Sequence, residues 1–532
     1  MEIIPGAIST INFADVTSPG KVLINVYRAD TGKPVDAKIL ISGGKVSIVR
    51  YLQVSTAYTD VENIGKAELN LAPGTYTLTV SYGGGFISKP VVLKDVKVES
   101  GTTLKYTVSI DILVKPKELG WYSADLHHHS NILDGRTPPD YLVVAQSAAA
   151  LDFVFVSDHD SVVNHKEIAY WAEKRNMPFI PSVEISPNWG HFNPYPLPLG
   201  KDVLYRGTPS EIFKAAREAG AIVIRVNHPY RGGYFISWEK NELPGPYSPD
   251  WDVAEINGRW DRSDNKTLMK MWEFWNKGLK YYISAGSDTH DIWSSPYTGY
   301  PRVYAYIPAK PTPEAFAYAE KYGHSFITYG PLVFMEPLPG MTIPVKDEKS
   351  ISLKLNLWAV DGLSRLIIVS MGKRVYKKTF PDKPINIKLE VEIPIEKLFA
   401  DNVVSWISVM VWDADGDLAI TNPVWISKEV VRPTITKTTT VTVTQTRVET
   451  KTLTQTQIQT VTTTTTSTAT IRTTITKTTT ETATQIKTIT STKVSITTTE
   501  VSITRWDITI AAAIIALIVG IAISYVLAKK KV

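Results

Sequence analysis

Residues 121–130 have the sequence WYSADLHHHS, and this pattern is the starting point for interpreting the chain. The aromatic residues at its start favour a β-strand. Residues two apart on a strand project from the same face, so Asp125, His127 and His129 would share one face. His128 would point away from them. Two imidazoles with this spacing can bind one metal ion, and a nearby carboxylate can orient one of the rings. The stretch therefore predicts a metal site at a strand end.

The composition limits the chemistry that such a site can use. The chain has 532 residues, which allows roughly three or four domains, and it contains no cysteine. Disulfides and thiolate ligands are excluded, so any metal must be bound by His, Asp or Glu. The formal charge of +5 is small for this length and gives no reason to expect nucleic-acid binding. All nine histidines lie between His127 and His324, so they mark one domain.

Residues 118–338 contain that domain. Predicted strands alternate with predicted helices through it, which favours parallel strands covered by helices, in an open sheet or a barrel. Five strands are apolar and then finish in His, Asp or Glu, in the segments DLHHH, SDHD, VEIS, NHP and GSDTH. Ionisable groups are costly to bury without partners, and the active sites of such barrels lie at the carboxyl ends of the strands. We therefore expect these segments to meet at one site.

The regions on either side, residues 1–117 and 339–430, show the short alternating segments of β-sandwiches. The first has about seven such segments, and its LAPGTYTLTVSYGG resembles the prealbumin-like or carboxypeptidase-regulatory type of accessory domain. Neither region contains a histidine, so we expect both to support the central domain. The acidic run DADGD at 413–417 lacks the remaining ligands of a calcium loop and is interpreted as a turn.

The composition changes after residue 430. About half of residues 434–504 are Thr, with no Gly or Pro among them, so residues 431–505 are predicted to form a disordered, extended stalk. The alternation of Thr with Val and Ile has strand propensity as well, which leaves a β tract as the alternative.

The end of the chain has the pattern of a membrane anchor. Residues 506–528 form an apolar run long enough for a transmembrane helix, and residues 529–532 form a basic tail. The positive-inside rule then predicts a single-pass protein of the cell membrane with its catalytic domain outside. Residues 1–20 show no secretory signal, so a tail-anchored protein with cytoplasmic domains is the alternative.

The central motifs identify a family resemblance. Residues 121–335, about two-fifths of the chain, resemble a PHP domain (polymerase and histidinol phosphatase), in particular its carbaryl-hydrolase-like branch. The resemblance lies in the order of the motifs DLHHHS, LDG, SDHD, VEIS with GH after it, NHP and GSDTH. It implies a multidomain α/β protein in which a distorted (β/α)7-type barrel holds two or three divalent metal ions.

The resemblance also implies a role for each motif residue. Ligands of the His and carboxylate type suit Zn, Mn or Fe ions. Ions about 3.5–4 Å apart lower the pKa of a water molecule and stabilise the attacking and leaving oxygens, which is the chemistry of hydrolysis. We expect Glu184, Asp158 and His159 to take part in catalysis. The nine implied ligands are His127, His129 and Asp288 for a first ion, His191 and His228 for a second, Glu184 as the bridge between these two, and Asp134, His159 and His290 for a third.

Other residues near the motifs each have two interpretations. Asp125 and Asp158 either orient the ligand histidines or cap strand ends, and Asp158 is also a candidate for a proton relay. His128 is expected to be structural, because it faces away from the site. His165 is expected at the surface, at the start of a helix, and His324 either lines the mouth of the pocket or lies outside it.

Candidate substrate contacts come from the later strands. Arg225 and Arg259 could bind a phosphate or carboxylate of the substrate, because a guanidinium group matches those oxygens, or they could form ordinary ion pairs. Glu255 and Asn257 follow each other on one strand face and could contact substrate or water. Trp189 either walls the pocket or belongs to the core.

These observations favour a membrane-anchored, cell-surface metallohydrolase that acts on a small-molecule substrate, with phosphoester hydrolysis as the preferred reaction. Hydrolysis of a carbamate, ester or amide is the first alternative, and a non-catalytic surface binding protein is the second. The third alternative is a cytoplasmic enzyme that processes nucleic acid, which no basic patch with interleaved aromatic residues supports.

Overall fold

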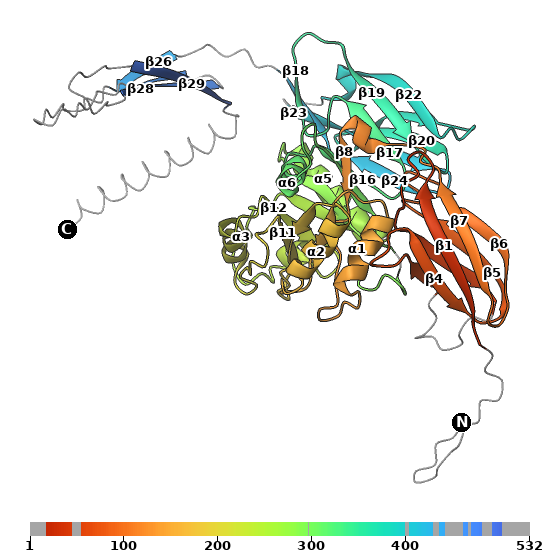
Figure 1. Cartoon of the computed structure of the whole chain (residues 1–532). Coiled ribbons are helices and arrows are strands. Elements are labelled where there is room, and N and C mark those ends of the chain that lie inside the picture. Colours follow the sequence, from red (N-terminus) through yellow and green to blue (C-terminus); the bar gives the residue numbers. More distant parts are fainter. Residues whose placement is uncertain are drawn as a thin grey trace, which may run out of the picture. The chain divides into compact units, whose positions relative to one another are not determined.

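The computed structural model describes residues 18–44, 55–295, 297–399 and 404–428, and four strands between residues 436 and 502. The chain divides into two compact units, Met1–Lys428 and Glu429–Val532. Figure 1 shows the whole chain, coloured along the sequence.

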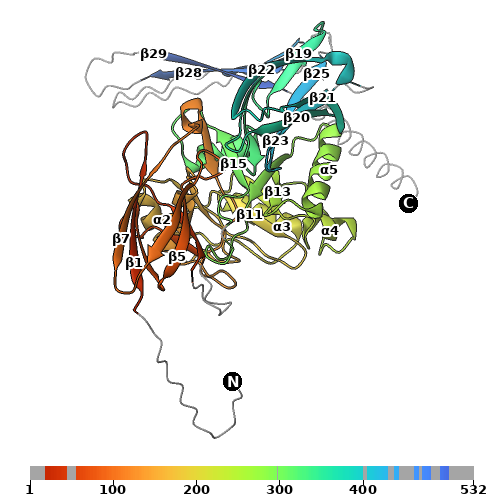
Figure 2. The same cartoon turned by 90° about the vertical axis from the view of Figure 1, so that its right-hand side faces the viewer.

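The N-terminal region is a sandwich of two sheets (red to orange in Figure 2). Its strands are β1 (Gly20–Arg28), β2 (Lys38–Gly43), β3 (Thr56–Tyr58), β4 (Lys66–Leu71), β5 (Gly74–Ser81), β6 (Val91–Val98) and β7 (Thr103–Ile110). One sheet has the order β4-β1-β7 and the other has the order β3-β2-β5-β6. Alternate residues of β1, including Val22, Ile24 and Val26, are buried in the core between the sheets. The described part of residues 1–117 thus has the predicted strands and the predicted two layers.

The central region alternates strands with helices, as the sequence predicts. A short 3-10 helix, η1 (Pro116–Leu119), leads into it. The strands are β8 (Trp121–Ala124), β9 (Val154–Val156), β10 (Phe179–Pro181), β11 (His191–Tyr195), β12 (Val223–Asn227), β13 (Val253–Asn257), β14 (Tyr282–Gly286), β15 (Arg302–Tyr306) and β16 (Ser325–Thr328). The helices are α1 (Pro139–Ala148), α2 (His165–Lys174), α3 (Pro209–Glu218), α4 (Tyr234–Glu239), α5 (Arg262–Asn276) and α6 (Pro313–Lys321).

Local signals in the sequence fix several helix starts. In α3 the Thr208 side chain accepts a hydrogen bond from the Glu211 amide, and the Glu211 side chain accepts one from the Thr208 amide. The same reciprocal pair joins Asp261 and Asp264 at the start of α5. Such capping boxes satisfy amides that have no partner within the helix. Residues 258–261 join the end of β13 to the start of α5, and the second of these capping boxes fixes that start.

The strands β8–β14 are joined in separate ladders. Strands β9 and β10 pair in parallel, and β11-β12-β13-β14 form a four-stranded sheet in which β11 is antiparallel. Short bridges join the ladders: His128 pairs in parallel with Thr289, Ile185 pairs with Phe192 in antiparallel orientation, and Ser157 N donates to His128 O (2.9 Å). The described residues therefore do not form one continuous barrel ladder. They do bring the carboxyl ends of these strands to one region.

The C-terminal β-region shares a sheet with the central region. Its strands are β17 (Leu332–Glu336), β18 (Thr342–Val345), β19 (Ser350–Trp358), β20 (Leu363–Ser370), β21 (Lys373–Thr379), β22 (Asn386–Pro394), β23 (Val404–Asp413), β24 (Leu418–Thr421) and β25 (Val424–Lys428), with a 3-10 helix η2 (Ile395–Lys397). The second layer is the sheet β17-β19-β22. Strand β24 pairs with β16, so β8, β15 and β16 continue into β23 and β25 within a nine-stranded sheet.

This shared sheet changes the predicted domain organisation. Residues 118–338 alternate strands with helices, and residues 339–430 consist mainly of strands, as predicted. The two regions are not separate, however, because their strands pair in one sheet and their side chains share one core. Trp406 and Trp425 of the C-terminal region are buried in the same apolar cluster as the central strands. Pairing between β16 and β24 depends on residues almost a hundred positions apart, which local patterns do not reveal.

The N-terminal sandwich is fixed to the central region by buried polar contacts. Arg175 at the end of α2 pairs with Asp36, at 2.7 Å between Nε and Oδ2, and both side chains are almost fully buried. The Tyr58 hydroxyl of β3 donates to the Ile292 carbonyl (3.1 Å). Breaking such a buried pair leaves an uncompensated charge, so these contacts position the sandwich specifically.

The second unit corrects part of the stalk prediction. Within residues 431–505 the structure has two antiparallel pairs, β26 (Thr436–Val441) with β27 (Val461–Thr466) and β28 (Thr470–Thr480) with β29 (Thr492–Ser502). The strand propensity of alternating Thr, Val and Ile accounts for this, in place of a stalk without secondary structure. The predicted transmembrane helix at 506–528 and basic tail lie outside the described residues. Among the residues that were described, no helix has the length and apolar character needed to cross a membrane.

Candidate metal centre

Nine predicted ligands gather at the strand ends of the central region. The stretch after β8 carries His127 and His129, and residues beyond β10, β12 and β14 carry further ligands. His191 is the first residue of β11. Because β11 is antiparallel to β12, this first residue lies opposite Asn227, at the carboxyl end of β12. The groups whose donor atoms all lie within 4.8 Å of one another are His127, His129 and Asp288; His159, Glu184 and His191; and His129, Asp134, His159 and His290.

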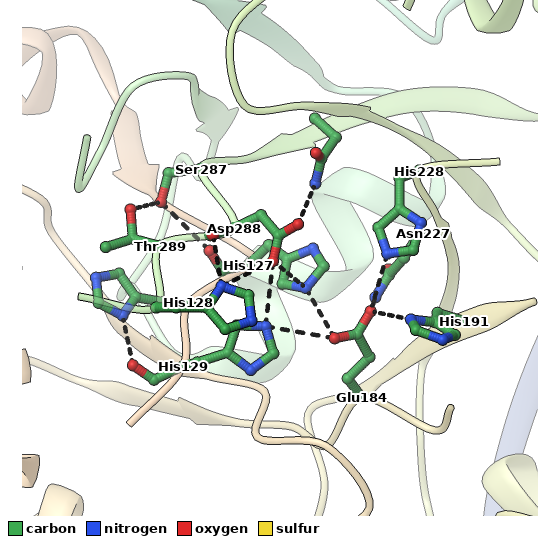
Figure 3. Close-up of polar contacts among 12 residues, drawn as sticks. His127, His128, His129, Glu184, His191, Asn227, His228, Ser287, Asp288 and Thr289 are labelled. Carbon is green, nitrogen blue, oxygen red and sulfur yellow. Dashed lines mark hydrogen bonds and ion pairs between the residues drawn. The ribbon is translucent and has the colours of Figure 1, made fainter. Parts of the chain in front are cut away.

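Glu184 lies at the centre of this cluster, and its two oxygens face different imidazoles. Oε2 lies 3.1 Å from His127 Nε2 and 3.3 Å from both His129 Nε2 and His159 Nδ1. Oε1 lies 3.1 Å from His191 Nδ1 and 3.2 Å from His228 Nε2. Figure 3 shows the carboxylate with His127 and His129 on one side and His191 and His228 on the other. A carboxylate placed in this way can bridge two ions.

The spacing of the donor atoms fits metal coordination. Metal–ligand bonds of about 2.0–2.1 Å put neighbouring donors about 2.9–3.4 Å apart, depending on coordination geometry. The imidazole nitrogens around Glu184 lie 3.1–3.3 Å from its oxygens. Nδ1 of His129 and of His228 is buried without a hydrogen-bond partner in the described residues. In both rings it is Nε2, not Nδ1, that faces Glu184, so the fit to a metal ion rests on the Nε2 atoms. The His, Asp and Glu groups present could therefore hold metal ions.

The charges of the cluster support one another. Burial acts to raise the pKa of Glu184, but the neighbouring imidazoles, above all His127, hold that pKa well below its ordinary value. Burial likewise acts against ionised Asp288, and His127 and His129 hold its pKa well below the usual range. Burial lowers the pKa of His129 to about 4, which keeps this imidazole neutral at neutral pH. Burial acts to lower the pKa of His127, but Asp288, Glu184 and Glu255 hold it well above the ordinary value, so His127 must lose a proton when it binds a metal ion.

The cluster opens toward solvent at one end. The Asp134 side chain is 59% exposed, and its Oδ2 lies 3.2 Å from His290 Nε2 and 3.7 Å from His159 Nε2. His127, His129 and Glu184, by contrast, are at most 1% exposed. An ion held by the Asp134 group would therefore be the most accessible one.

Backbone geometry at the site is unusual for the residues concerned. His228 and Asp288 have positive φ values, 27° and 56°. Non-glycine residues in this region carry strain of order 1–3 kcal/mol and concentrate at functional sites. A side chain at Gly286, the last residue of β14, would place Cβ 2.3 Å from the His127 Cβ, so glycine permits the close approach of the two segments.

The alternation predicted for residues 121–130 holds for the three histidines, although β8 itself ends at Ala124. His127 and His129 face Glu184, whereas the Nε2 of His128 lies 3.0 Å from the Thr298 hydroxyl. His128 is fully buried. Its role is therefore structural, as its position in the sequence indicates.

Glu255 and Arg225 are positioning residues rather than substrate contacts. Glu255 Oε1 lies 2.8 Å from His127 Nδ1, so Glu255 orients the ring from behind. Arg225 Nη2 lies 3.2 Å from the same oxygen. Both side chains have no exposed surface, which corrects the expectation that they bind substrate. The predicted carboxylate behind a ligand histidine exists, but it comes from β13, and its link to His127 spans 128 positions.

Asp125 and Asp158 do not contact the ligand imidazoles, which corrects the expectation that they orient those rings. Asp125 accepts hydrogen bonds from the Ser287 amide (2.8 Å) and hydroxyl (2.6 Å) and from the Gly299 amide (2.8 Å). Asp158 accepts from the Ser130 amide and hydroxyl, both at 2.6 Å. Burial raises the pKa of Asp158 to about 6. The two carboxylates hold the backbone of the ligand-bearing loops.

The remaining candidates lie at different distances from the cluster. Asn257 donates to Asp288 Oδ2 (3.3 Å) and is almost fully buried. Arg259 is exposed, hydrogen-bonds the Tyr297 hydroxyl and has no contact with the nine residues. Trp189 packs in the core against Phe192.

Two further histidines lie outside the cluster. His165 begins α2, as predicted, but it is buried, and its Nε2 lies 2.8 Å from the Ser182 carbonyl, so the expectation of a surface position is wrong. His324 Nδ1 lies 2.7 Å from the Pro339 carbonyl, away from the cluster.

Two polar residues at the site were not anticipated. Asn227 donates to Glu184 Oε1 (2.8 Å), and the Ser186 hydroxyl lies 2.6 Å from His159 Nδ1. Asn227 immediately precedes His228 in NHP, and Ser186 follows Glu184 by two positions in VEIS. This closeness to a predicted ligand was the signal in the sequence that could have identified them.

Comparison with known proteins gives local similarity. No family model matches the chain. A segment of 78 residues, 15% of the chain, is 35% identical to a 3',5'-nucleoside bisphosphate phosphatase of Chromobacterium violaceum and covers 27% of that protein. The chain therefore spans about a quarter of the length of this curated relative. The similarity is confined to this segment of the chain.

Solved structures show weaker likeness. One is a two-domain protein of Bacteroides vulgatus containing a predicted PHP-like metal-dependent phosphoesterase, with 16% identity over 58% of this chain and 95% of that chain and a TM-score of 0.36. Another is an amidohydrolase of Chromobacterium violaceum, with 16% identity over 36% of this chain and 93% of that chain and a TM-score of 0.24.

Proposed function

We propose that this protein is a metal-dependent hydrolase of the PHP type that cleaves phosphoesters with two or three Zn, Mn or Fe ions. The observation that carries the proposal is the position of Glu184, whose two oxygens face five imidazoles from four separate segments of the chain. His127, His129 and Asp288 would hold one ion, and His191 and His228 a second, with Glu184 shared between them. Asp134, His159 and His290 would hold the third. In this proposal β8–β14 act as a distorted (β/α)7 barrel.

The chain's own residues prepare the site for hydrolysis. Divalent ions bound there would supply an acidified water molecule and positive charge for the oxygens of a phosphoryl group. Glu255 fixes the ring of His127, so the opposite nitrogen points into the cluster. Ser186 does the same for His159, because its hydroxyl lies 2.6 Å from Nδ1 and leaves Nε2 toward Asp134. Asn227 holds Glu184 by a hydrogen bond to Oε1. These contacts preorganise the donors before substrate binds.

A cavity beside the cluster offers room for the organic part of a substrate. It has a volume of about 400 Å³, and its lining includes Ser186, Trp189, Tyr205 and Arg206. Ser186 connects this cavity to His159. An arginine and aromatic rings suit a substrate that combines negative charge with a flat apolar group. The local similarity to a phosphatase agrees with a phosphoester as that substrate.

We also propose that the protein is anchored in the cell membrane with its catalytic region outside. The apolar run at 506–528 and the lysines that follow it support this orientation. The Thr-rich residues 431–505 would then separate the catalytic region from the membrane. Protease treatment of intact cells tests the location, because an external catalytic region is cleaved from the cells and an internal one is protected.

A substrate panel tests the reaction. The purified full-length chain is assayed against aryl phosphates, nucleoside bisphosphates and aryl esters, before and after chelation and with each ion restored. The proposal predicts phosphate release that chelation abolishes and that Zn, Mn or Fe restores. Metal-dependent ester cleavage without any phosphate release would replace phosphoester hydrolysis with the carboxyl-type alternative.

A further inference from the structure

A second cavity lies between the N-terminal sandwich and the central region, apart from the metal cluster. It has a volume of about 610 Å³, which is within the range of small-molecule sites. None of the nine predicted ligands lines it. Thr298 lines the cavity, and its hydroxyl is hydrogen-bonded to His128, the histidine that points away from the cluster. The cavity therefore lies on the other side of the histidine stretch. Its lining residues are Lys38, Leu40, Tyr58, Ser81, Gly84, Phe86, Ala145, Ala148, Ala149, Arg259, Trp260, Tyr297, Thr298, Tyr300 and Arg302.

Among the lining residues, Arg302 gives the clearest indication of the kind of ligand that the cavity could bind. It is 2% exposed, its Nε donates to the Gly299 carbonyl (2.8 Å), and its Nη1 has no hydrogen-bond partner in the described residues. The guanidinium lies over the Phe86 ring, at 3.6 Å. No described carboxylate lies within ion-pairing distance of it. A buried charge without a counter-ion is costly, so a ligand that supplied negative charge here would be strongly favoured.

The carboxylates whose charge reaches Arg302 are committed elsewhere. Asp125 accepts from Ser287 and Gly299, and Asp152 accepts from Ser123 and pairs with Lys117 at 2.6 Å. Burial lowers the pKa of Arg302. The Tyr304 hydroxyl, which hydrogen-bonds the guanidinium and carries no charge at neutral pH, opposes that effect more than Asp125 and Asp152 do. The charge of Arg302 is therefore not neutralised from within the protein.

The rest of the lining adds positive charge and flat apolar surface. Lys38 and Arg259 bring two further cations, and the lining includes no Asp or Glu. The charge of Arg302 lowers the pKa of Lys38, after the larger effect of burial, so the cations repel one another across the cavity. Aromatic residues form much of the remaining wall: Tyr58, Phe86, Trp260, Tyr297 and Tyr300.

We propose that this cavity is a binding site for an aromatic anion, a compound in which a carboxylate, sulfonate or phosphate group is attached to a flat ring. The anionic group would pair with Arg302, with Arg259 at the mouth of the cavity. The ring would stack on the aromatic wall, where offset or edge contacts between rings are favourable. This site is independent of the proposed hydrolysis, because it shares no residue with the metal cluster.

Calorimetric titration of the full-length chain with benzenesulfonate tests the proposal, because a sulfonate is a poor metal ligand and the ring is flat. Benzenesulfonamide has nearly the same shape without the charge and serves as the matched ligand. The site predicts that the sulfonate binds at least about tenfold more tightly than the sulfonamide, since charge-assisted bonds to a guanidinium are the stronger kind. Equal affinity for both ligands, or no binding of the sulfonate, would overturn the proposal.

Substitutions locate the bound anion. Arg302→Met keeps the length of the buried side chain and is expected to weaken sulfonate binding at least about tenfold. Arg259→Gln, at the exposed mouth, should weaken sulfonate binding about threefold to tenfold. If Arg302→Met does not fold, this second substitution tests whether the anion binds in the cavity. Arg365→Gln is the control, because Arg365 also lies over an aromatic ring, that of Trp412 at 4.0 Å, outside this cavity. Binding that survives both cavity substitutions, or that is lost only in Glu184→Gln, would place the anion elsewhere and contradict the site.

Discussion

The metal cluster and the acidic turn at residues 413–417 both concentrate ionisable groups, but the pKa values of their carboxyl groups shift in opposite directions. In the turn, Asp413 Oδ1 accepts hydrogen bonds from the amides of Asp415 (3.1 Å) and Asp417 (2.8 Å). Burial, with the charge of Asp417, raises the pKa of Asp413 to about 7. In the cluster, imidazoles hold the pKa values of Glu184 and Asp288 well below the ordinary range.

The contrast separates a functional concentration of charge from a structural one. Asp413 Oδ1 is satisfied by backbone amides within the same few residues, which stabilises a local conformation, and Asp417 Oδ1 accepts from the Tyr300 hydroxyl. The donors of the cluster come from segments far apart in sequence and face one another across a common space. Convergence of distant donor atoms, rather than the number of acidic or basic residues, is the feature that supports a metal site.

The largest effect is expected for Glu184→Gln. The amide preserves the size of the side chain but lacks the charge and the second equivalent oxygen, so a bridge between two ions cannot form. Activity is expected to fall by roughly 10³-fold, on the scale of losing one principal catalytic interaction. Bound metal should fall by at least one ion per chain. Glu336→Gln, at an exposed position, is the control. Wild-type metal content and activity in Glu184→Gln would remove the basis for the bridge.

A smaller effect is expected for Glu255→Gln, which acts through His127. The neutral side chain holds the ring less firmly and leaves the buried Arg225 without its counter-ion. Metal affinity, measured by competition with a chelator, is expected to fall about 10–100-fold. Glu320→Gln is the matched control, because Glu320 is equally buried but contacts Tyr195 and none of the nine ligands. Equal metal affinity in the two variants would mean that Glu255 has no positioning role.

The effect of Asp134→Asn should be smaller again, because Asp134 lies at the exposed end of the cluster. The weaker amide ligand is expected to release the third ion while the two ions at Glu184 stay bound. We expect about tenfold lower activity, restored by excess metal. Metal titration followed by activity checks this. Loss of all ions together would show that the exposed group does not act separately.

The smallest effect is expected in the acidic turn, where Asp413→Asn should leave activity and metal content unchanged. The folded-state pKa of Asp413 is raised to about 7 from 3.8, so the folded protein binds the proton more tightly than the unfolded chain. Its contribution to stability is present at acidic pH and is lost as the pH rises through about 7. The variant, which cannot ionise, should therefore gain about 1–3 °C in melting temperature relative to wild type when the pH is raised from about 5 to about 8. A pH-independent difference would contradict the raised pKa.

The sequence was informative where a motif carried its own geometry. Alternation along a strand assigned His127 and His129 to one side and His128 to the other, and the ordered motifs located all nine cluster residues. Interactions between distant segments were not predictable in the same way. The ring of His127 is oriented by Glu255, not by the nearby Asp125, and the burial of His165 depends on the Ser182 carbonyl from the next strand region. The sheet shared by β16 and β24 is a further case, because its pairing has no local signal.

The most direct test of divalent-ion binding by the strand-end cluster is the metal stoichiometry of the purified full-length chain. The chain is stripped with a chelator, reloaded with Zn, Mn or Fe, dialysed against metal-free buffer and measured by elemental mass spectrometry beside Glu184→Gln. We expect about two or three bound ions per wild-type chain, because nine His, Asp and Glu ligands with one bridging carboxylate can hold that number. We also expect fewer ions in the variant. Less than one ion per wild-type chain would contradict metal binding by the cluster.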